Sequence, residues 1–155
     1  MTALTDNKSG IKKQLIDFCI QKQNITIEAA REAMIRVQDS ANEETAGGED
    51  KFESFREQCQ IDRDMYAKKI NESMQGLAIL KGLTTKLLFE ATLGAVIITE
   101  TQRFFVSIGL GEIVLDGVSY FAISTQSPLY LAMNGKKVGE HYEFRGQRFL
   151  IKDVF

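Results

Sequence analysis

The chain has 155 residues, of which 21 are acidic and 19 are basic, so its formal net charge is −2. A composition of 44% hydrophobic and 26% charged residues excludes a mainly disordered chain, and no apolar run approaches the roughly 18 residues of a membrane-spanning helix. The N-terminus lacks the apolar core of a secretory signal, and two cysteines do not make a disulfide framework. The charge balance argues against a dedicated nucleic-acid binder. We expect a soluble, cytoplasmic protein of one or two small domains.

The first half of the chain is expected to form two long helices, over residues 1–81. Neither glycine nor proline occurs in residues 11–46 or 49–75, and Gly47-Gly48 separates these runs. Both runs carry apolar residues at steps of three and four, which is the spacing of one helical face. At about 1.5 Å per residue, some 30 residues in each helix give an arm of about 45 Å. An antiparallel hairpin within one chain is the preferred arrangement; an ordinary bundle and a homodimeric coiled coil are the alternatives.

Facing residues of an antiparallel hairpin have numbers with a nearly constant sum. Folding the chain about residue 46 makes that sum 92, which pairs Ala33 with Cys59 and Val37 with Phe55. Cys19 then lies opposite Ser73, far from Cys59. We therefore expect two buried or half-buried thiols, as is usual in a reducing compartment.

The tip of this hairpin is acidic. Residues 39–50 contain no basic residue and five acids, namely Asp39, Glu43, Glu44, Glu49 and Asp50. Mg²⁺ prefers carboxylate oxygens, so such a tip is suited to sharing a metal ion. The structural alternative is that Asp50 and Glu53 form a capping box for the second helix. That alternative does not explain Glu43 and Glu44, which lie near a helix C-terminus where the macrodipole disfavours carboxylates.

The second half, residues 82–155, is expected to be a small α+β domain. Strands are predicted over residues 95–100, 103–108, 112–115, 118–124, 140–144 and 147–154, arranged as an antiparallel sheet. Asp116-Gly117 is a strong signal for a two-residue hairpin turn, and Arg145-Gly146 joins the last two strands. Ser127-Pro128 begins a short helix over residues 129–133, which Asn134-Gly135 ends. Most strand aromatics are expected in the core.

No arrangement of nucleophile and base is visible in the sequence. His141 is the only histidine and lies in a predicted strand, where a surface or edge position is the common outcome. Dinucleotide-binding, P-loop, CxxC and HExxH motifs are all absent from the sequence. The sequence therefore does not predict an enzyme that acts alone.

One stretch of the second half carries a specific motif. Residues 123–129 read Ile-Ser-Thr-Gln-Ser-Pro-Leu, and residues 135–140 read Gly-Lys-Lys-Val-Gly-Glu, on either side of the predicted short helix. In this motif and its spacing the chain resembles the Gre-type transcription elongation factors, and specifically a divergent branch of them. The resemblance implies an FKBP-like C-terminal domain behind an N-terminal coiled-coil hairpin with an acidic tip. Residues 51–57 look like the family's opening of the second helix. The likeness covers nearly the whole chain but is specific only in the C-terminal motif.

The resemblance implies a function at bacterial RNA polymerase. Such factors dock on the rim of the secondary channel, and their tip carboxylates help to hold the polymerase's second Mg²⁺, so that the polymerase cleaves backtracked RNA. The tip acids Glu43, Glu44, Glu49 and Asp50 are then the catalytic and metal-sharing candidates, with RNA contacted only indirectly. For docking we single out the surface of Ser127, Pro128, Leu129, Lys136 and Lys137, although Ser127-Pro128 can equally serve only to start a helix. A monomer without a cofactor of its own is expected.

The tip departs from the family pattern, which is Asp-x-x-Glu-Asn-x-Glu-Tyr. With Phe52 aligned to the tyrosine, Thr45 and Gly48 stand where the two key acids belong. Either the shifted carboxylates do the same work, or the chain is a non-cleaving regulator or inhibitor of the polymerase. A prolyl isomerase or chaperone built on the FKBP-like domain is a third hypothesis, and a coiled-coil adaptor is the fallback.

Overall fold

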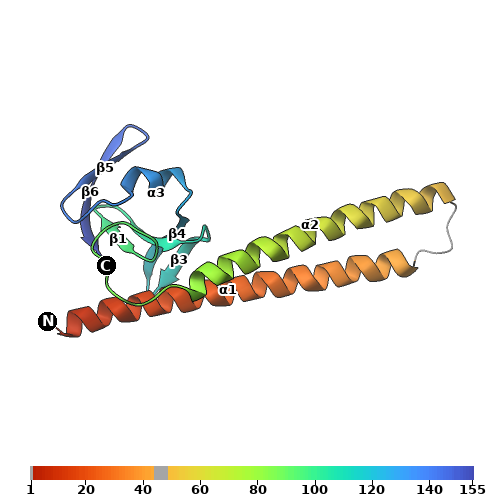
Figure 1. The fold of residues 1–155 in the computed structure, drawn as a ribbon, viewed down its shortest axis with the longest axis horizontal. Helices are drawn as coiled ribbons and strands as arrows, with labels where there is room; N and C mark the ends of the chain where they lie inside the picture. Colours follow the sequence, from red (N-terminus) through yellow and green to blue (C-terminus); the bar gives the residue numbers. More distant parts are fainter. Residues whose placement is uncertain (1, 44–48) are drawn as a thin grey trace. The chain divides into compact units, whose positions relative to one another are not determined.

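The computed structural model describes the backbone of residues 2–43 and 49–155 (Figure 1). It confirms the expected fold class: two long helices precede a mostly antiparallel sheet with one short helix. The described elements are α1 Thr2–Glu43, α2 Glu49–Lys81, β1 Val96–Thr99, β2 Arg103–Ser107, β3 Gly111–Leu115, β4 Val118–Ser124, α3 Pro128–Met133, β5 His141–Phe144 and β6 Gln147–Val154. Every predicted strand is present, and no observed strand end differs from its predicted position by more than one residue.

Two compact units divide the chain. One consists of residues 21–78, which are parts of α1 and α2. The other combines residues 1–20 with residues 79–155 and is called the sheet unit below. The boundary predicted near residue 82 lies just beyond the end of α2, but the first 20 residues group with the sheet and not with the rest of α1.

Helix α1 begins earlier than the glycine-free run suggests and continues through Gly10. Glycine in a helix interior is less favourable than alanine by about 0.5–1 kcal/mol. The helix persists there because the residues after it are held against the sheet: Leu15, Ile16 and Cys19 are buried in the core of the sheet unit. Packing therefore outweighs the local preference of Gly10.

Replacing Gly10 by alanine is expected to stabilise the protein by about 0.5–1 kcal/mol. A Cβ built at this position meets no atom within 4 Å, so the methyl group introduces no clash. Urea unfolding of the wild type and of Gly10→Ala measures the difference. Gly94→Ala is the contrasting variant, because Gly94 has a φ of +91° that side chains rarely adopt. A loss of stability in Gly10→Ala would contradict the helical assignment of this segment.

The sheet has the strand order β3-β4-β2-β1-β6-β5. Four of its neighbouring pairs are antiparallel, but β2 and β4 are parallel, with Phe104 opposite Phe121 and Ser107 opposite Ser124. The prediction of a wholly antiparallel sheet was wrong at this pair. After β2 the chain forms the outer strand β3 and then turns back as β4. Strand β4 lies between β3 and β2, is antiparallel to β3, and runs in the same direction as β2.

Both faces of the sheet are covered, which explains why its central strands are apolar at successive positions. Val96 and Phe105 belong to one core cluster, together with Leu15 of α1 and Leu80 of α2. The next residues along the same strands, Ile97 and Phe104 among them, belong to a second cluster with Tyr130 and Met133 of α3. Adjacent strand residues point to opposite faces, so both can be buried.

The two predicted hairpin turns have the backbone that such turns require. Asp116 and Gly117 have φ of +50° and +77°, and Arg145 and Gly146 have φ of +53° and +77°. Two successive positive φ values are typical of the type I′ turn, which matches the twist of antiparallel strands.

A side-chain contact also occurs at the second of these turns. The Arg145 guanidinium lies 5.1 Å from the centre of the Phe144 ring, which is a cation–π contact.

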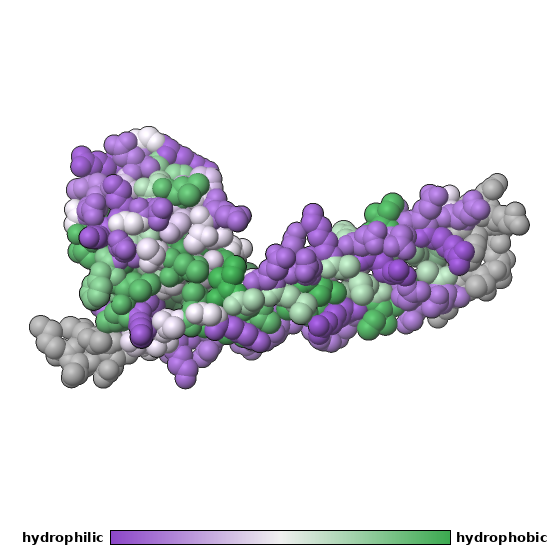
Figure 2. Space-filling model, viewed as in Figure 1, coloured by the Kyte–Doolittle hydropathy of each residue, from purple (hydrophilic) through white to green (hydrophobic). Residues whose placement is uncertain are grey.

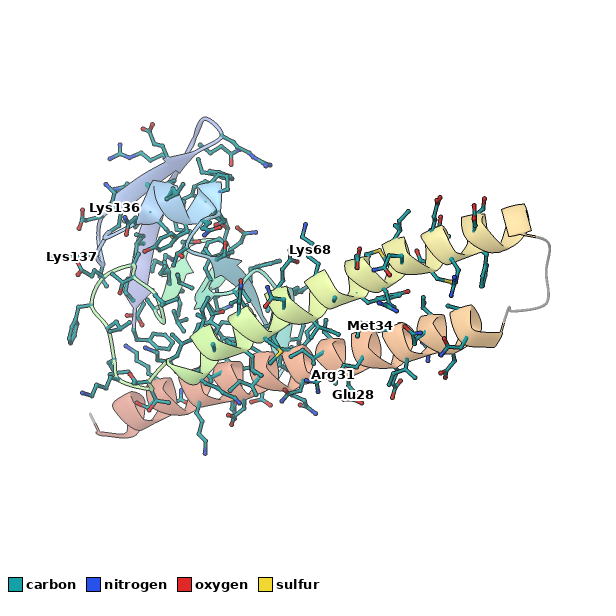
Figure 3. The ribbon with its side chains drawn as sticks, turned by 45° about the vertical axis from the view of Figure 1, so that its right-hand side comes forward. Glu28, Arg31, Met34, Lys68, Lys136 and Lys137 are labelled. Carbon is teal, nitrogen blue, oxygen red and sulfur yellow. The ribbon has the colours of Figure 1, made fainter. Side chains whose placement is uncertain are left out.

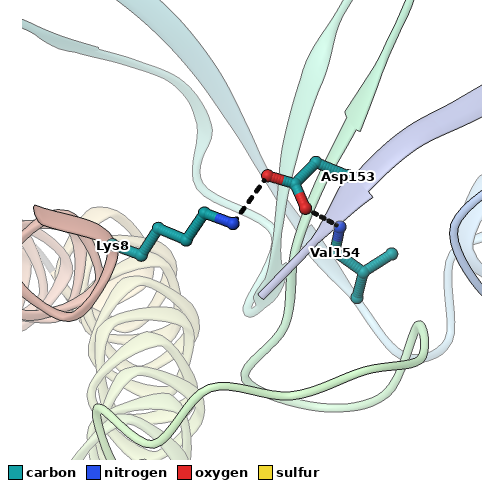
Figure 4. Close-up of polar contacts among 3 residues, drawn as sticks. All are labelled: Lys8, Asp153 and Val154. Carbon is teal, nitrogen blue, oxygen red and sulfur yellow. Dashed lines mark hydrogen bonds and ion pairs between the residues drawn. The ribbon is translucent and has the colours of Figure 1, made fainter. Parts of the chain in front are cut away.

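Polar contacts also hold the first part of α1 within the sheet unit. Lys8 Nζ lies 3.1 Å from Asp153 Oδ2, while Asp153 Oδ1 accepts a hydrogen bond of 2.9 Å from the backbone N–H of Val154 (Figure 4). The same ammonium group lies 5.4 Å from the centre of the Phe155 ring. The end of the chain is thus fixed to the start of α1 by one ion pair and one cation–π contact.

Lys12 is a buried cation one turn further along α1. Its residue is 0% exposed, and its Nζ donates a hydrogen bond of 2.7 Å to the backbone carbonyl of Lys86. Ser9 Oγ donates to the neighbouring carbonyl of Thr85 at 3.3 Å. Burial lowers the pKa of the Lys12 ammonium from 10.5 to about 8, because leaving water disfavours the charged form.

Residues 21–78 form an antiparallel helical pair, as predicted. Gln23 Nε2 donates to the backbone carbonyl of Ser73 at 3.2 Å, and Arg63 donates to the side-chain oxygen of Gln38. The face of this unit that Figure 2 shows is mostly hydrophilic, with separate hydrophobic groups. Cys19 and Cys59 are both buried and are not joined by a disulfide, as expected. No helix in the described part of the chain is long and apolar enough to cross a membrane.

Candidate functional site

Three of the four acids predicted at the tip lie at helix ends. Glu43 is the last residue of α1, and Glu49 and Asp50 are the first two residues of α2. Glu44 falls between the helices, outside the described residues, and no side chain of the four is described. Their role in holding a metal stays a prediction.

The helical pair next to the tip contains a groove of about 290 Å³. Ala33 and Val37 of α1 line it opposite Phe55 and Cys59 of α2, so the pairs predicted from the sequence share one groove. On the neighbouring side, a hollow of about 350 Å³ is lined by polar residues that include Gln38, Asn42 and Arg63. Among the side chains that the structure describes, no group of three or more His, Cys, Asp or Glu could hold a metal ion.

The predicted docking motif forms the start of α3. Ser127 is the N-cap, and its Oγ accepts a hydrogen bond of 3.1 Å from the backbone N–H of Tyr130. Pro128 follows as the first helical residue and is exposed, whereas Leu129 is half-buried against the core. At the other end of α3, the Tyr130 hydroxyl donates to Asn134 Oδ1 at 2.9 Å. Ser127 and Leu129 thus have structural roles, which leaves Pro128 as the motif residue most open to a partner.

Replacing Ser127 by alanine is expected to reduce the free energy of unfolding by about 1 kcal/mol, because an orphan N–H of α3 loses its acceptor. Ser127→Asp is the matched variant that keeps an acceptor at the cap and should retain most of the stability. Urea unfolding of the three proteins measures both effects. Equal stability of wild type and Ser127→Ala would show that the cap contributes nothing.

Lys136 and Lys137 follow α3 and lie on a short antiparallel contact with the segment that precedes β1 (Figure 3). Glu90 and Lys137 form an isolated bridge, and the N–H of Ala91 donates to the carbonyl of Lys136 at 2.8 Å. The backbone N–H of Lys137 also donates to Glu140 Oε1 at 3.0 Å. The backbone of both lysines is fixed, while their ammonium groups take part in no ion pair within the described residues.

Two exposed apolar residues near this motif were missed by the sequence reasoning. Leu131 of α3 is 62% exposed, and Phe89, in the segment before β1, is 79% exposed. No periodicity marks Leu131, because residues 129–133 are all apolar or aromatic, and only the structure shows that Tyr130 and Met133 are the buried ones. No pattern marked Phe89, which follows two leucines and reads as core.

The remaining sequence prediction in this unit concerns His141. It lies exposed on β5, which is an edge strand of the sheet. The expected surface or edge position is confirmed.

Comparison with known proteins gives no family match and no match to a curated protein. Among solved structures, the chain is similar to the GreA factor homolog 1 (Gfh1) of Thermus thermophilus, with 17% identity over 92% of this chain and 93% of that chain and a TM-score of 0.33. It is also similar to a structure of the transcription factor Gfh1, with 18% identity over 90% of this chain and 92% of that chain and a TM-score of 0.30. These TM-scores are low, so the likeness assigns neither a family nor an activity.

Proposed function

We propose that the chain is a transcription factor that binds bacterial RNA polymerase in its secondary channel. The observation that carries the proposal is the Gre-like motif of residues 123–140, which forms the short capped helix and lysine turn that its resemblance implies. In the sequence this motif follows a pair of long antiparallel helices. A factor that enters the channel needs such a helical pair as well as a docking domain. Neither feature alone would distinguish such a factor from a coiled-coil adaptor.

In this proposal the four tip acids approach the polymerase active site and help to hold its second Mg²⁺. Their oxygen donors suit Mg²⁺, which prefers carboxylates. When bound, the ion stabilises charge on the attacking and leaving oxygens of RNA cleavage. Glu43, Glu44, Glu49 and Asp50 contribute negative charge and ligand atoms, while the sheet unit provides the surface that docks. The chain does no chemistry alone, because the polymerase cleaves the RNA.

A non-cleaving regulator is the second candidate, favoured by the displacement of the tip acids from the Gre pattern and by Gly47-Gly48. Such a factor would occupy the channel without adding well-placed ligands to the metal. Both candidates require binding to the polymerase and differ only in the effect on cleavage.

Backtracked polymerase complexes carrying labelled RNA test the proposal. Binding of the chain with faster RNA cleavage supports the cleavage factor, and binding with unchanged or slower cleavage supports the regulator. Absence of binding would exclude both. A peptide isomerisation assay on the same preparation addresses the prolyl isomerase hypothesis, which measurable turnover would revive.

A further inference from the structure

A pocket of about 290 Å³ lies within the sheet unit and is called the Gly10 pocket below. One side of it is a single face of α1, lined at helical spacing by Asn7, Gly10, Ile11 and Gln14. The other side is the hairpin of β3 and β4, which contributes Leu115, Asp116, Val118 and Tyr120. Two segments that are about 100 residues apart in the sequence thus enclose one space.

Gly10 leaves the helical side of this pocket open. A Cβ built at Gly10 would meet no atom within 4 Å, so any larger side chain would occupy part of the empty space. Glycine is also less favourable than alanine in a helix interior. A residue that weakens its helix and at the same time opens a pocket is typical of a functional site.

The Tyr120 hydroxyl is a polar group without a partner at this pocket. The residue is only 6% exposed, and its hydroxyl makes no hydrogen bond to any residue that the structure describes. Ser107 Oγ is the only described side-chain atom that is both fully buried and unpaired, so the Tyr120 hydroxyl still reaches solvent, through the pocket that Tyr120 lines. Buried hydroxyls are normally hydrogen-bonded, which makes this one a position where a ligand can supply the missing partner.

The hydroxyl is available both as a donor and as an acceptor. Burial raises the pKa of Tyr120 above its usual value of 10.0, so the group is protonated at neutral pH. Arg103 lowers this pKa and Asp116 raises it, which shows that charges of both signs lie near the hydroxyl and oppose each other. Such surroundings favour a neutral ligand over a strongly charged one.

The rest of the lining is partly amide and partly apolar. The exposed side chains of Asn7 and Gln14 each offer an N–H donor next to a carbonyl acceptor, and neither is hydrogen-bonded within the described part of the chain. Ile11, Leu115 and Val118 are half-buried and supply apolar surface. The volume is at the lower end of the range of about 300–1,000 Å³ for ligand pockets, so the ligand must be small.

We propose that the Gly10 pocket binds a small neutral molecule with an N–H donor next to a carbonyl or ring-nitrogen acceptor, which pairs with the Tyr120 hydroxyl and the amides of Asn7 and Gln14. A nucleobase and a carboxamide both have this edge, and side-chain amides pair with either. The apolar residues of the pocket cover the body of the ligand. The inference does not depend on the proposed function, because it uses neither the tip acids nor polymerase binding.

Nuclear magnetic resonance titration of the ¹⁵N-labelled full chain tests the inference. Adenosine, cytidine and nicotinamide are the probes, and toluene is the apolar comparison. At millimolar concentration, at least one of the three polar probes is expected to shift the amide signals of Gly10 and of residues 115–120, while toluene leaves them unchanged. Nucleosides alone would assign the site to a nucleobase, and nicotinamide alone would assign it to a carboxamide.

Tyr120→Phe removes the hydroxyl and keeps the ring. It is expected to weaken binding by about tenfold without lowering stability to urea, because the hydroxyl has no partner in the folded chain. Tyr130→Phe is the matched control, since the Tyr130 hydroxyl donates to Asn134 Oδ1 and lies outside the pocket. This control should lose stability and keep the wild-type affinity. Gly10→Leu should fill the pocket and abolish binding while the helix is retained.

Three results would overturn the inference. The first is no shift with any polar probe. The second is toluene binding as strongly as the polar probes, which would make the site an apolar hollow. The third is unchanged binding by both Tyr120→Phe and Gly10→Leu, which would place the probe elsewhere. Circular dichroism confirms that each variant is folded, and failure of polymerase binding would leave the inference intact.

Discussion

Replacing Glu43, Glu44, Glu49 and Asp50 together by alanine is expected to abolish stimulated RNA cleavage while binding to the polymerase is retained. On the proposed mechanism these carboxylates act on the metal and do not dock the protein. Loss of groups that stabilise charge in a transition state typically lowers a rate by about 10²-fold or more. The cleavage rate of labelled RNA in backtracked complexes, measured at saturating factor, reports the effect.

A control with the same change in charge distinguishes a tip effect from a general one. Glu28, Glu32, Glu53 and Glu57 are exposed residues of the same two helices, and their replacement by alanine also removes four negative charges. This control should cleave at the wild-type rate. Cleavage retained in the tip variant would contradict the metal-sharing role, and equal losses in both variants would attribute the effect to charge alone.

The stability of the protein is expected to increase from pH 8 to pH 10.5 because of Lys12. Its pKa is lowered by burial to about 8 in the folded protein, against 10.5 when it is exposed. Between these values the unfolded chain binds a proton that the folded chain does not, so raising the pH favours folding. The contribution amounts to about 1.4 kcal/mol per pH unit, or about 3 kcal/mol over the window.

The variant Lys12→Met isolates this contribution, because it keeps a long apolar side chain and removes the titrating group. The variant also removes the hydrogen bond to the Lys86 carbonyl, so wild type and Lys12→Met are compared by the slope of their stability against pH and not by their stability at one pH. Urea unfolding at pH 7.5 to 10 should show the wild type gaining stability relative to Lys12→Met as the pH rises. The exposed neighbour Lys13, changed to methionine, should leave the wild-type pH profile intact. Parallel profiles of wild type and Lys12→Met would refute the prediction.

Local signals in the sequence were sufficient for the strands, the hairpin turns and the short helix α3, but not for the start of α1, which continues through Gly10. Asp116-Gly117 and Arg145-Gly146 occupy turns with positive φ, as their dipeptides predict. Ser127 caps α3, because a serine before a proline suits a helix start. These features depend on a few adjacent residues, so they can be read without knowing what lies nearby in space.

The candidate site was only partly accessible to the same reasoning. Lys136 and Lys137 could be placed on a turn from the sequence, but their pairing with Glu90 and Ala91 could not, since the two segments are more than 40 residues apart. Leu87, Leu88 and Phe89 look equally apolar in the sequence. Only the folded chain shows that Leu87 and Leu88 are partly buried against the two core clusters, while Phe89 is exposed.

The sequence by itself determined the strands, the two hairpin turns and most of the two long helices of this protein, because periodicity and turn chemistry are local. It also determined the acidic tip, which is a matter of composition. Tertiary structure alone decided that residues 1–20 group with the sheet, that β4 lies parallel to β2, and that Lys12 is buried. The physical reason is the same in each case: an apolar stripe shows that a face will be buried, but the partner that buries it is chosen by packing over the whole chain.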